Sequence, residues 1–194
     1  MAKGPRYRIP FRRRKEGKTN YHRRLKLLKS RRLRAVIRVS TKHTRVQIVK
    51  SKLGGDEILV SSISRELSNG YGWDASTNSL PAAYLTGYLA GVRAIEKDIS
   101  DCILDIGLFY HKNRVLAAFK GLLDAGLEIP HRSEFFPESL EERFDGSHIE
   151  NYAKLLREED PERYEEQFSG YLQKKVDPRK ITSMFENTLK KIKS

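Results

Sequence analysis

Apolar and polar residues alternate along two consecutive stretches in the first third of the chain, and a third stretch is mostly apolar. The alternation runs through residues 33–39 and 45–49, whereas residues 58–63 are mostly apolar on both faces, and all three stretches are rich in Val and Ile. A period of two places apolar side chains on one face and is typical of β-strands. Polar or glycine-containing turns at 40–43 and 54–56 separate the stretches. The pattern therefore predicts a hairpin-linked β-meander.

The pattern changes to helical spacing after residue 79. Apolar residues recur at intervals of three and four over 80–95 and 114–125, and a short apolar strand at 102–106 lies between them. Gly126 is expected to end the second helix, and residues 127–129 are expected to form a last strand. This order predicts an α/β fold with a mixed sheet, in which the later strands are parallel neighbours joined by right-handed crossovers.

Two details refine this core. Residues 67–79 are predicted to form a loop, and Trp73 is predicted to plug the core from it. The helix over 80–95 has a face of small residues that allows a close approach to the sheet, formed by Ala83, Gly87, Ala90, Gly91 and Ala94.

From residue 131 onward the chain is expected to be helical. One helix runs from about Ser147, and two more start at Asp160-Pro161 and Asp177-Pro178, where Asp is a cap and Pro occupies the first helical position. The last two helices have apolar stripes, which require a surface to pack on. That surface is either the chain's own body or a partner. The resulting division is a basic arm at 1–32, an α/β core at 33–130 and a helical extension at 131–194.

Charge is distributed unevenly. Residues 1–50 contain 19 of the 38 Lys and Arg residues but only one acid, Glu16, so the remainder of this +13 chain is mildly acidic. The arm has too little apolar surface and too much like charge to fold alone. A short helix capped by Thr19 or Asn20 is expected to anchor it through a stripe of Tyr21, Leu25 and Leu28.

The arm predicts nucleic-acid binding. Arg fits phosphate and stacks on bases, and the interleaved aromatic residues favour irregular or unpaired RNA. Arginines on one face of the meander form either a solvated surface or an RNA platform, and we favour the platform. The residues predicted to contact RNA are Arg6, Tyr7, Arg8, Arg12, Arg13, Arg14, Lys15, Lys18, Tyr21, His22, Arg23, Arg24, Lys26, Lys29, Arg34, Arg38, Lys42, His43, Arg45, Tyr110, His111, Lys112 and Arg114.

Other function classes are less consistent with the sequence. A single cysteine, Cys102, excludes a disulfide framework or a thiolate zinc cluster, and no signal peptide or membrane span is expected. A Mg²⁺-dependent nuclease would need converging carboxylates, and the spacing of the candidates does not force convergence. A general polyanion binder remains an alternative. The nuclease candidates are Asp74, Asp101, Asp105 and Asp124.

Several motifs together resemble a known family. They are GPRYRIPFRRRKEGKTNYHRRLKLLKS, RVSTKH, GWDASTNSLPAAYLTGYLAGVRA, LDIG and GLEIPH, in this order. They resemble the large-subunit ribosomal protein that binds 5S ribosomal RNA (the universal L18 family), and the segment HIENYAKLLREEDPERYEEQFSGYLQKKVDP is similar to its archaeal and eukaryotic branch.

The resemblance implies a three-layer ribonuclease-H-like fold, as found in translational machinery components, and no enzymatic activity or cofactor. It also implies a place in the large ribosomal subunit, and the single cysteine indicates a reducing, cytoplasmic setting. The partners would be 5S ribosomal RNA, the large-subunit ribosomal RNA and neighbouring proteins of the central protuberance, without a membrane or a small-molecule substrate. The family's contact loop is similar to Tyr110, His111, Arg114 and Val115, although Lys112-Asn113 replaces its usual glycine.

Overall fold

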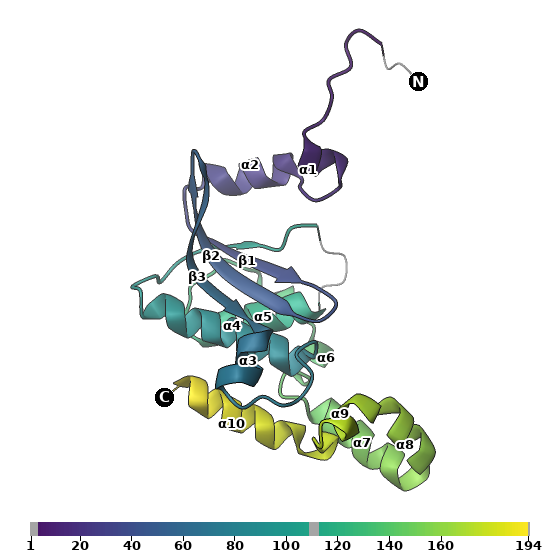
Figure 1. Ribbon diagram of the computed structural model, residues 1–194. Coiled ribbons are helices and arrows are strands. Elements are labelled where there is room, and N and C mark those ends of the chain that lie inside the picture. The colour runs from purple at the N-terminus through teal and green to yellow at the C-terminus, as the bar shows by residue number, and fades with distance from the viewer. Residues whose placement is uncertain (1–3, 109–112, 194) are drawn as a thin grey trace.

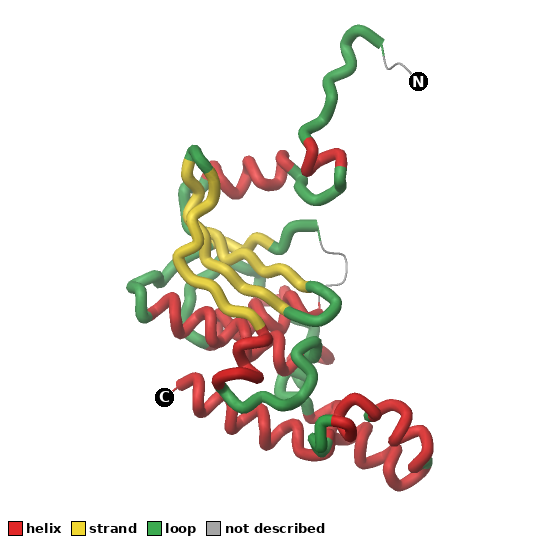
Figure 2. Tube along the Cα trace, in the orientation of Figure 1, coloured by secondary structure: helices red, strands yellow, loops and turns green. Residues whose placement is uncertain are grey.

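Four β-strands form one mixed sheet with the order β3-β2-β1-β4. In the computed structural model, which describes residues 4–108 and 113–193, β1 (Arg34–Val39), β2 (Thr44–Lys52) and β3 (Gly55–Ile63) form an antiparallel meander. The short strand β4 (Ile103–Asp105) pairs with β1 in parallel. The strands are the yellow segments of Figure 2. The predicted α/β class and mixed sheet are confirmed.

One face of the sheet forms the main hydrophobic core. The register places Ala35 and Ile37 of β1 beside Ile48 and Val46 of β2, and all four side chains are fully buried. Helices α4 (Leu80–Ile95) and α5 (Asn113–Asp124) cover this face (Figure 1). The alternation of apolar residues thus fixes which face is covered, because successive strand side chains point to opposite sides.

The small-residue face of α4 packs mainly against α5, whereas the sequence suggested close packing on the sheet. A Cβ atom added at Gly87 would collide with the backbone carbonyl of Ala118, and one added at Gly121 would collide with the carbonyl of Tyr84. The two helices therefore approach at a distance that only glycine permits. Gly126 has φ +104° and follows the last turn of α5, which confirms its predicted role as a stop.

Two predictions about the connections are wrong in part. Helix α3 (Ser64–Gly70) occupies the start of the predicted loop, although Trp73 is fully buried as expected and donates from Nε1 to the Ser76 carbonyl. Residues 127–129 form no strand, since only Glu128 pairs, in a single parallel bridge with Asp101. Pro130 follows directly and lacks an N–H, so the ladder cannot continue.

The C-terminal part is helical, and its capping signals are confirmed. The side chain of Asp160 accepts from the N–H of Arg163, and that of Asp177 accepts from the N–H of Arg179. The second predicted helix is divided at Phe168, where the backbone leaves helical geometry. The elements are 3₁₀ turn η1 (Ser133–Phe135), α6 (Glu138–Glu141), α7 (Ser147–Glu159), α8 (Pro161–Gln167), α9 (Ser169–Gln173), 3₁₀ turn η2 (Pro178–Lys180) and α10 (Ile181–Lys193).

The apolar stripes of these helices pack on the chain itself. On α10, Ile181 and Phe185 join a buried cluster with Trp73 and with Leu85 of α4. In a separate cluster, α8 and the residue after it pack on α7 through Tyr164 and Phe168. The chain's own body is therefore the surface that the stripes require. None of the helices in the two described ranges has the length and apolar character needed to cross a bilayer.

Candidate nucleic-acid interface

The first residues of the basic arm extend away from the body of the molecule. Residues 4–10 form no helix or strand and lead to the single-turn helix α1 (Arg12–Lys15) (Figure 1). Arg6, Tyr7 and Arg8 are exposed, as are all four basic residues of α1. The cations predicted to contact RNA here are thus accessible, with apolar surface beside them.

A compact turn connects α1 to the next helix. Nε of Arg13 donates to Oγ1 of Thr19 over 2.9 Å, and the ammonium of Lys18 lies 2.8 Å from Glu16. The rings of Phe11 and Tyr21 lie 5.4 Å apart between their centroids. The half of the arm nearer the body therefore has local contacts of its own, although its composition indicated that the arm does not fold alone.

Helix α2 (Tyr21–Lys29) begins where the sequence predicted, because Oδ1 of Asn20 accepts from the N–H of Arg23. Its predicted anchoring stripe is partly wrong. Leu25 is 55% exposed, whereas Leu27 lines a pocket against the sheet. The body-facing side is centred on Arg24, Leu27 and Leu28. The exposed residues on the other side include His22 and the cations Arg23, Lys26 and Lys29.

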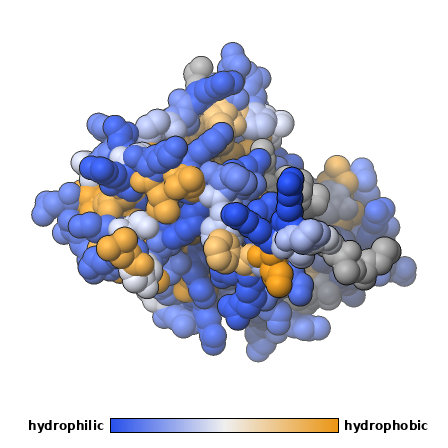
Figure 3. Space-filling view, turned by 90° about the horizontal axis from the view of Figure 1, so that it is seen from above, coloured by the Kyte–Doolittle hydropathy of each residue, from blue (hydrophilic) through white to orange (hydrophobic). Residues whose placement is uncertain are grey.

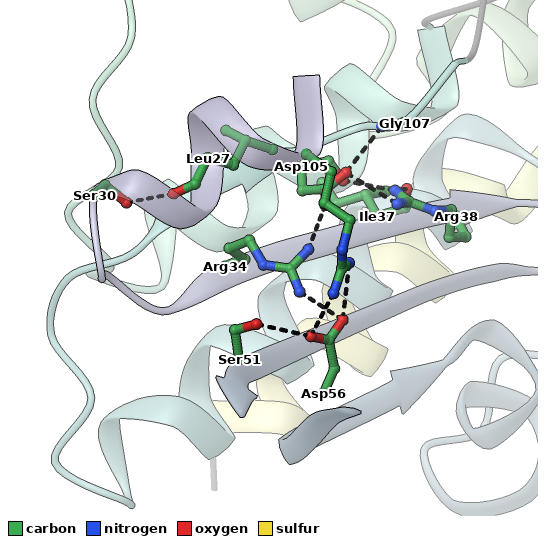
Figure 4. A network of polar contacts seen from close by, with 10 residues as sticks. Leu27, Ser30, Arg34, Ile37, Arg38, Ser51, Asp56, Asp105 and Gly107 are labelled. Atoms are coloured by element: carbon green, nitrogen blue, oxygen red, sulfur yellow. Dashed lines mark hydrogen bonds and ion pairs between the residues drawn. The ribbon is translucent and has the colours of Figure 1, made fainter. Parts of the chain in front are cut away.

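A chain of ion pairs joins α2 to the sheet. Both terminal guanidinium nitrogens of Arg24 donate to the carboxylate of Asp56, at 2.8 and 3.1 Å. Arg34 then bridges two acids, with 2.6 Å to Asp56 and 2.7 Å to Asp105, and Arg38 donates to Asp105 over 2.9 Å. Figure 4 shows Arg34 between the two carboxylates. These five residues, here called the arginine–aspartate network, fix the position of α2.

The network shifts the pKa values of Asp56 and Arg24. Partial burial alone would raise the pKa of Asp56, but the hydrogen bonds from Arg24 and Arg34 outweigh it and lower the pKa to about 2. The bond to Asp56 raises the pKa of Arg24, although burial opposes it. The contact between helix and sheet is therefore ionic at neutral pH.

The predicted arginine platform on the sheet needs correction. Arg38 and Arg45 are direct neighbours across β1 and β2, and Arg34 shares their face, as expected. However, Arg34 is only 2% exposed and Arg38 is held by Asp105. Arg45 is exposed, so a solvent-facing platform of three arginines does not form. The platform does not form because Asp56 and Asp105 bind the side chains of Arg34 and Arg38.

The β1–β2 turn is tied to the start of α5. Arg114 donates to the carbonyl of Ser40 over 2.9 Å and to Oδ1 of Asn78, and burial lowers the pKa of its guanidinium. Lys42 is exposed, and Nδ1 of His43 lies 3.3 Å from Oγ of Ser64. Arg114 therefore lies beside the β1–β2 turn, whose Lys42 and His43 are also predicted to contact RNA. The other three predicted loop residues, Tyr110, His111 and Lys112, lie outside the described residues.

A pocket of about 310 Å³ lies between α2 and the edge of the sheet. One wall comes from α2 and the residues before it, and the other from β4 and the following residues as far as Leu108. The face that includes α2, seen from above in Figure 3, is mainly hydrophilic with separate apolar patches.

The carboxylates considered for a nuclease have separate partners. Asp105 binds Arg34 and Arg38, Asp124 accepts from the hydroxyl of Tyr84 at 2.7 Å, and Asp101 lies 3.7 Å from Arg32. Within residues 4–108 and 113–193, no group of three His, Cys, Asp or Glu residues is arranged to hold a metal ion. Asp105 therefore has a structural role as the partner of two arginines, as its position in an apolar strand suggested.

Sequence reasoning missed the role of Asp56. It follows Gly54-Gly55 and resembles an ordinary turn acid, so its bond to Arg24, 32 positions earlier, has no local signal. The one available indication was charge, because Asp56 is the first acid after Glu16 in a very basic region.

The comparisons with known proteins agree with the motifs. Residues 5–101 match the family described as ribosomal large subunit proteins 60S L5 and 50S L18. The chain belongs to this family. The large ribosomal subunit protein uL18 of Aeropyrum pernix is 46% identical over 196 residues, which cover 99% of this chain and 90% of that protein. The family predicted from the motifs is confirmed, and it is one of ribosomal proteins with a role in translation.

Proposed function

We propose that this chain binds 5S ribosomal RNA and attaches it to the large ribosomal RNA in the central protuberance. In this proposal it is a non-catalytic constituent of the large ribosomal subunit in the cytoplasm, beside neighbouring ribosomal proteins. Family membership and the near end-to-end similarity to an archaeal uL18 support the ribosomal part. The motif resemblance supports the choice of 5S RNA and a ribonuclease-H-like core.

The single observation that carries the proposal is the placement of the cations. Residues 4–9 and 11–18 of the arm are exposed, while the apolar core lies apart from them below the sheet. A segment so rich in Arg gains binding free energy by displacing the condensed counterions of RNA phosphates. Exposed Phe11 and Tyr7 offer apolar rings beside the cations, which suits unpaired bases.

The network assigns different tasks to different arginines. Arg24, Arg34 and Arg38 bind acids of the same chain, so we assign them to holding α2 on the sheet. The exposed cations of residues 6–18 and of the outer face of α2 contact phosphate. We accordingly propose that residues 1–32 bind RNA, that the core at 33–130 positions them, and that residues 131–194 form a helical support.

The proposal is tested by equilibrium binding of the purified protein to 5S ribosomal RNA, with transfer RNA as competitor, across a salt series. A preference for 5S RNA that persists at about 0.2 M salt is expected, because shape recognition does not depend on counterion release alone. Equal binding of both RNAs that disappears with salt would instead identify a general polyanion binder.

Replacement of Arg12, Arg13 and Arg14 by Ala tests the arm directly. The slope of log K against log salt should decrease by about two to three units, from roughly 0.7–0.9 per phosphate contact. An unchanged slope would show that these three side chains do not touch phosphate.

A matched control removes the same charge elsewhere. Arg157, Arg163 and Lys174 are exposed on the C-terminal helices, and their replacement by Ala should leave the slope nearly unchanged. An equal decrease in both triple variants would mean that net charge, rather than the arm, determines binding.

A further inference from the structure

The pocket between α2 and the sheet edge combines apolar walls with cations. Its volume of about 310 Å³ is at the lower end of the range of roughly 300–1,000 Å³ typical of ligand sites. Its wall is more apolar than polar, with Leu27 on the helix side and Leu104, Ile106 and Leu108 on the sheet side. A site of this kind accommodates a flat apolar ring rather than an anion alone.

Cations line the helix side of the pocket. Arg23 and Lys26 are exposed residues of α2, and neither forms an ion pair with an acid in the described part of the chain. By contrast, Arg24 and Arg38, which also line the pocket, are held by Asp56 and Asp105. Lys18 also lines the pocket and is paired with Glu16. The pocket therefore has two cations available beside three that are held by acids.

The negative charge of Asp105, the acid in the pocket wall, is balanced by two arginines. The carboxylate of Asp105 accepts from Arg34, from Arg38 and from the backbone N–H of Gly107. It therefore opposes an anionic ligand little. Among the described residues, β4 is an edge strand of the sheet, so backbone groups on its outer side have no neighbouring strand beyond the single bridge at Glu128.

We propose that this pocket binds one unpaired nucleotide of the RNA, with the base between α2 and β4 and its phosphate at Arg23 and Lys26. The proposal rests on the proposed RNA-binding function and adds a specific site to it. A nucleotide has the three properties that the walls match: a flat ring, a hydrogen-bonding edge and a negative charge. An RNA nucleotide can enter only when it leaves the stack, as single-stranded loops and bulges allow.

The arginine–aspartate network builds the pocket before RNA arrives. Arg24 holds α2 against Asp56, and Leu27, one turn later on the same helix, then forms the wall. A pocket that exists in the free protein requires little ordering on binding, which favours affinity.

The test uses the full chain with ¹³C-labelled Leu and Ile methyl groups, observed by NMR. Each of the four ribonucleoside 5′-monophosphates is added at millimolar concentration, with ribose 5-phosphate as the probe that lacks a base. At least one mononucleotide should shift the methyl signals of Leu27 and Leu108 in a saturable way, and ribose 5-phosphate should not. Absence of a shift with all four mononucleotides, or an equal shift with ribose 5-phosphate, would overturn the proposal.

Two variants of α2 provide the matched comparison. Lys26→Ala removes a cation that lines the pocket, and Lys29→Ala removes an exposed cation of the same helix outside it. The first should weaken mononucleotide binding about 3- to 10-fold, as expected for the loss of one solvent-exposed hydrogen bond of ordinary strength, and the second less than 2-fold. Equal effects of both variants would show that the helix attracts nucleotides only through its general charge.

A titration of the same labelled protein with 5S ribosomal RNA separates this proposal from the general function. If the RNA binds and the pocket methyl signals shift, both proposals stand. If the RNA binds while these signals remain unchanged, the pocket proposal fails and the RNA-binding function stands. If mononucleotides enter the pocket but 5S RNA does not bind, the pocket proposal stands and the 5S function fails.

Discussion

Replacement of Asp105 by Ala should destabilise the protein strongly, although the residue lies in a strand of only three residues. The change removes the acceptor of Arg34, Arg38 and the N–H of Gly107. Arg34 is 2% exposed, so water has little access to the guanidinium to replace the lost carboxylate.

The magnitude follows from this burial. Removal of one member of a buried ion pair costs about 3–5 kcal/mol, because the other charge remains in the interior. Here Asp56 stays 2.6 Å from the other terminal nitrogen of Arg34 and still compensates part of the charge. We therefore expect a loss of about 3 kcal/mol, at the lower end of that range.

Urea unfolding of the RNA-free protein, followed by circular dichroism, measures this loss. With a slope near 2 kcal/mol per molar urea, the midpoint should move down by about 1.5 M. The double variant Arg34→Met, Asp105→Leu should lose less than the single variant, since apolar groups of similar size replace a buried pair with little cost.

Asp101→Ala is the control for this experiment. Asp101 lies at the start of the same segment, its side chain is 56% exposed and it is 3.7 Å from Arg32. An exposed pair of this kind contributes at most about 1 kcal/mol. If Asp105→Ala is no more destabilising than Asp101→Ala, the argument that Arg34 depends on its buried partners is wrong.

Two further predictions concern α2 and the α4–α5 contact. The pKa of Asp56 is lowered to about 2, so its support of α2 is complete above its unfolded pKa of about 4 and is lost as the pH falls towards 2. The NMR signals of the Arg24 side chain should change over the same pH range, and the variant Asp56→Asn should not show this change. An Arg24 signal that stays constant over this range in the unmodified protein would contradict the assignment. Gly87→Ala should cost about 1–3 kcal/mol in urea unfolding, because its methyl group meets the Ala118 carbonyl. Gly70→Ala, with open space around it, should not be destabilising, and equal losses would refute the packing argument.

Elements with local signals were predictable from the sequence. The alternation in β1 and β2 defined both strands and the buried face, because a half-buried strand requires that period. Asn20, Asp160 and Asp177 marked helix starts, since a side-chain acceptor near the first free N–H groups is a local requirement.

Features that depend on distant contacts were not predictable. The sequence could not show that α4 would pack on α5, because small residues suit either a helix or a sheet as neighbour. Residues 127–129 have the composition of a strand, yet only Glu128 finds a partner. Leu25 and Leu27 are equally apolar, and the docking of Arg24 on Asp56 determines which of them faces the body.

The candidate site shows the same limit. The sequence identified the basic arm, whose charge and exposure are local properties. It assigned Arg34 and Arg38 to the same surface, because a strand pattern gives the face of a residue but not the acids opposite it. The division into anchoring and exposed arginines therefore required the three-dimensional structure.

The packing of α10 has a consequence for synthesis of the protein. The cluster of Trp73, Leu85 and Ile181 contains residues from α10 and from segments about a hundred positions earlier. Because α10 follows every other helix and strand in the described sequence, this cluster cannot close until α10 has left the exit tunnel. A nascent chain exposes the apolar side of α4 until then, and such surface is what chaperones recognise. A chain truncated before α10 would keep this apolar surface exposed, and such surface favours aggregation, so the docking of α10 also protects the molecule from self-association.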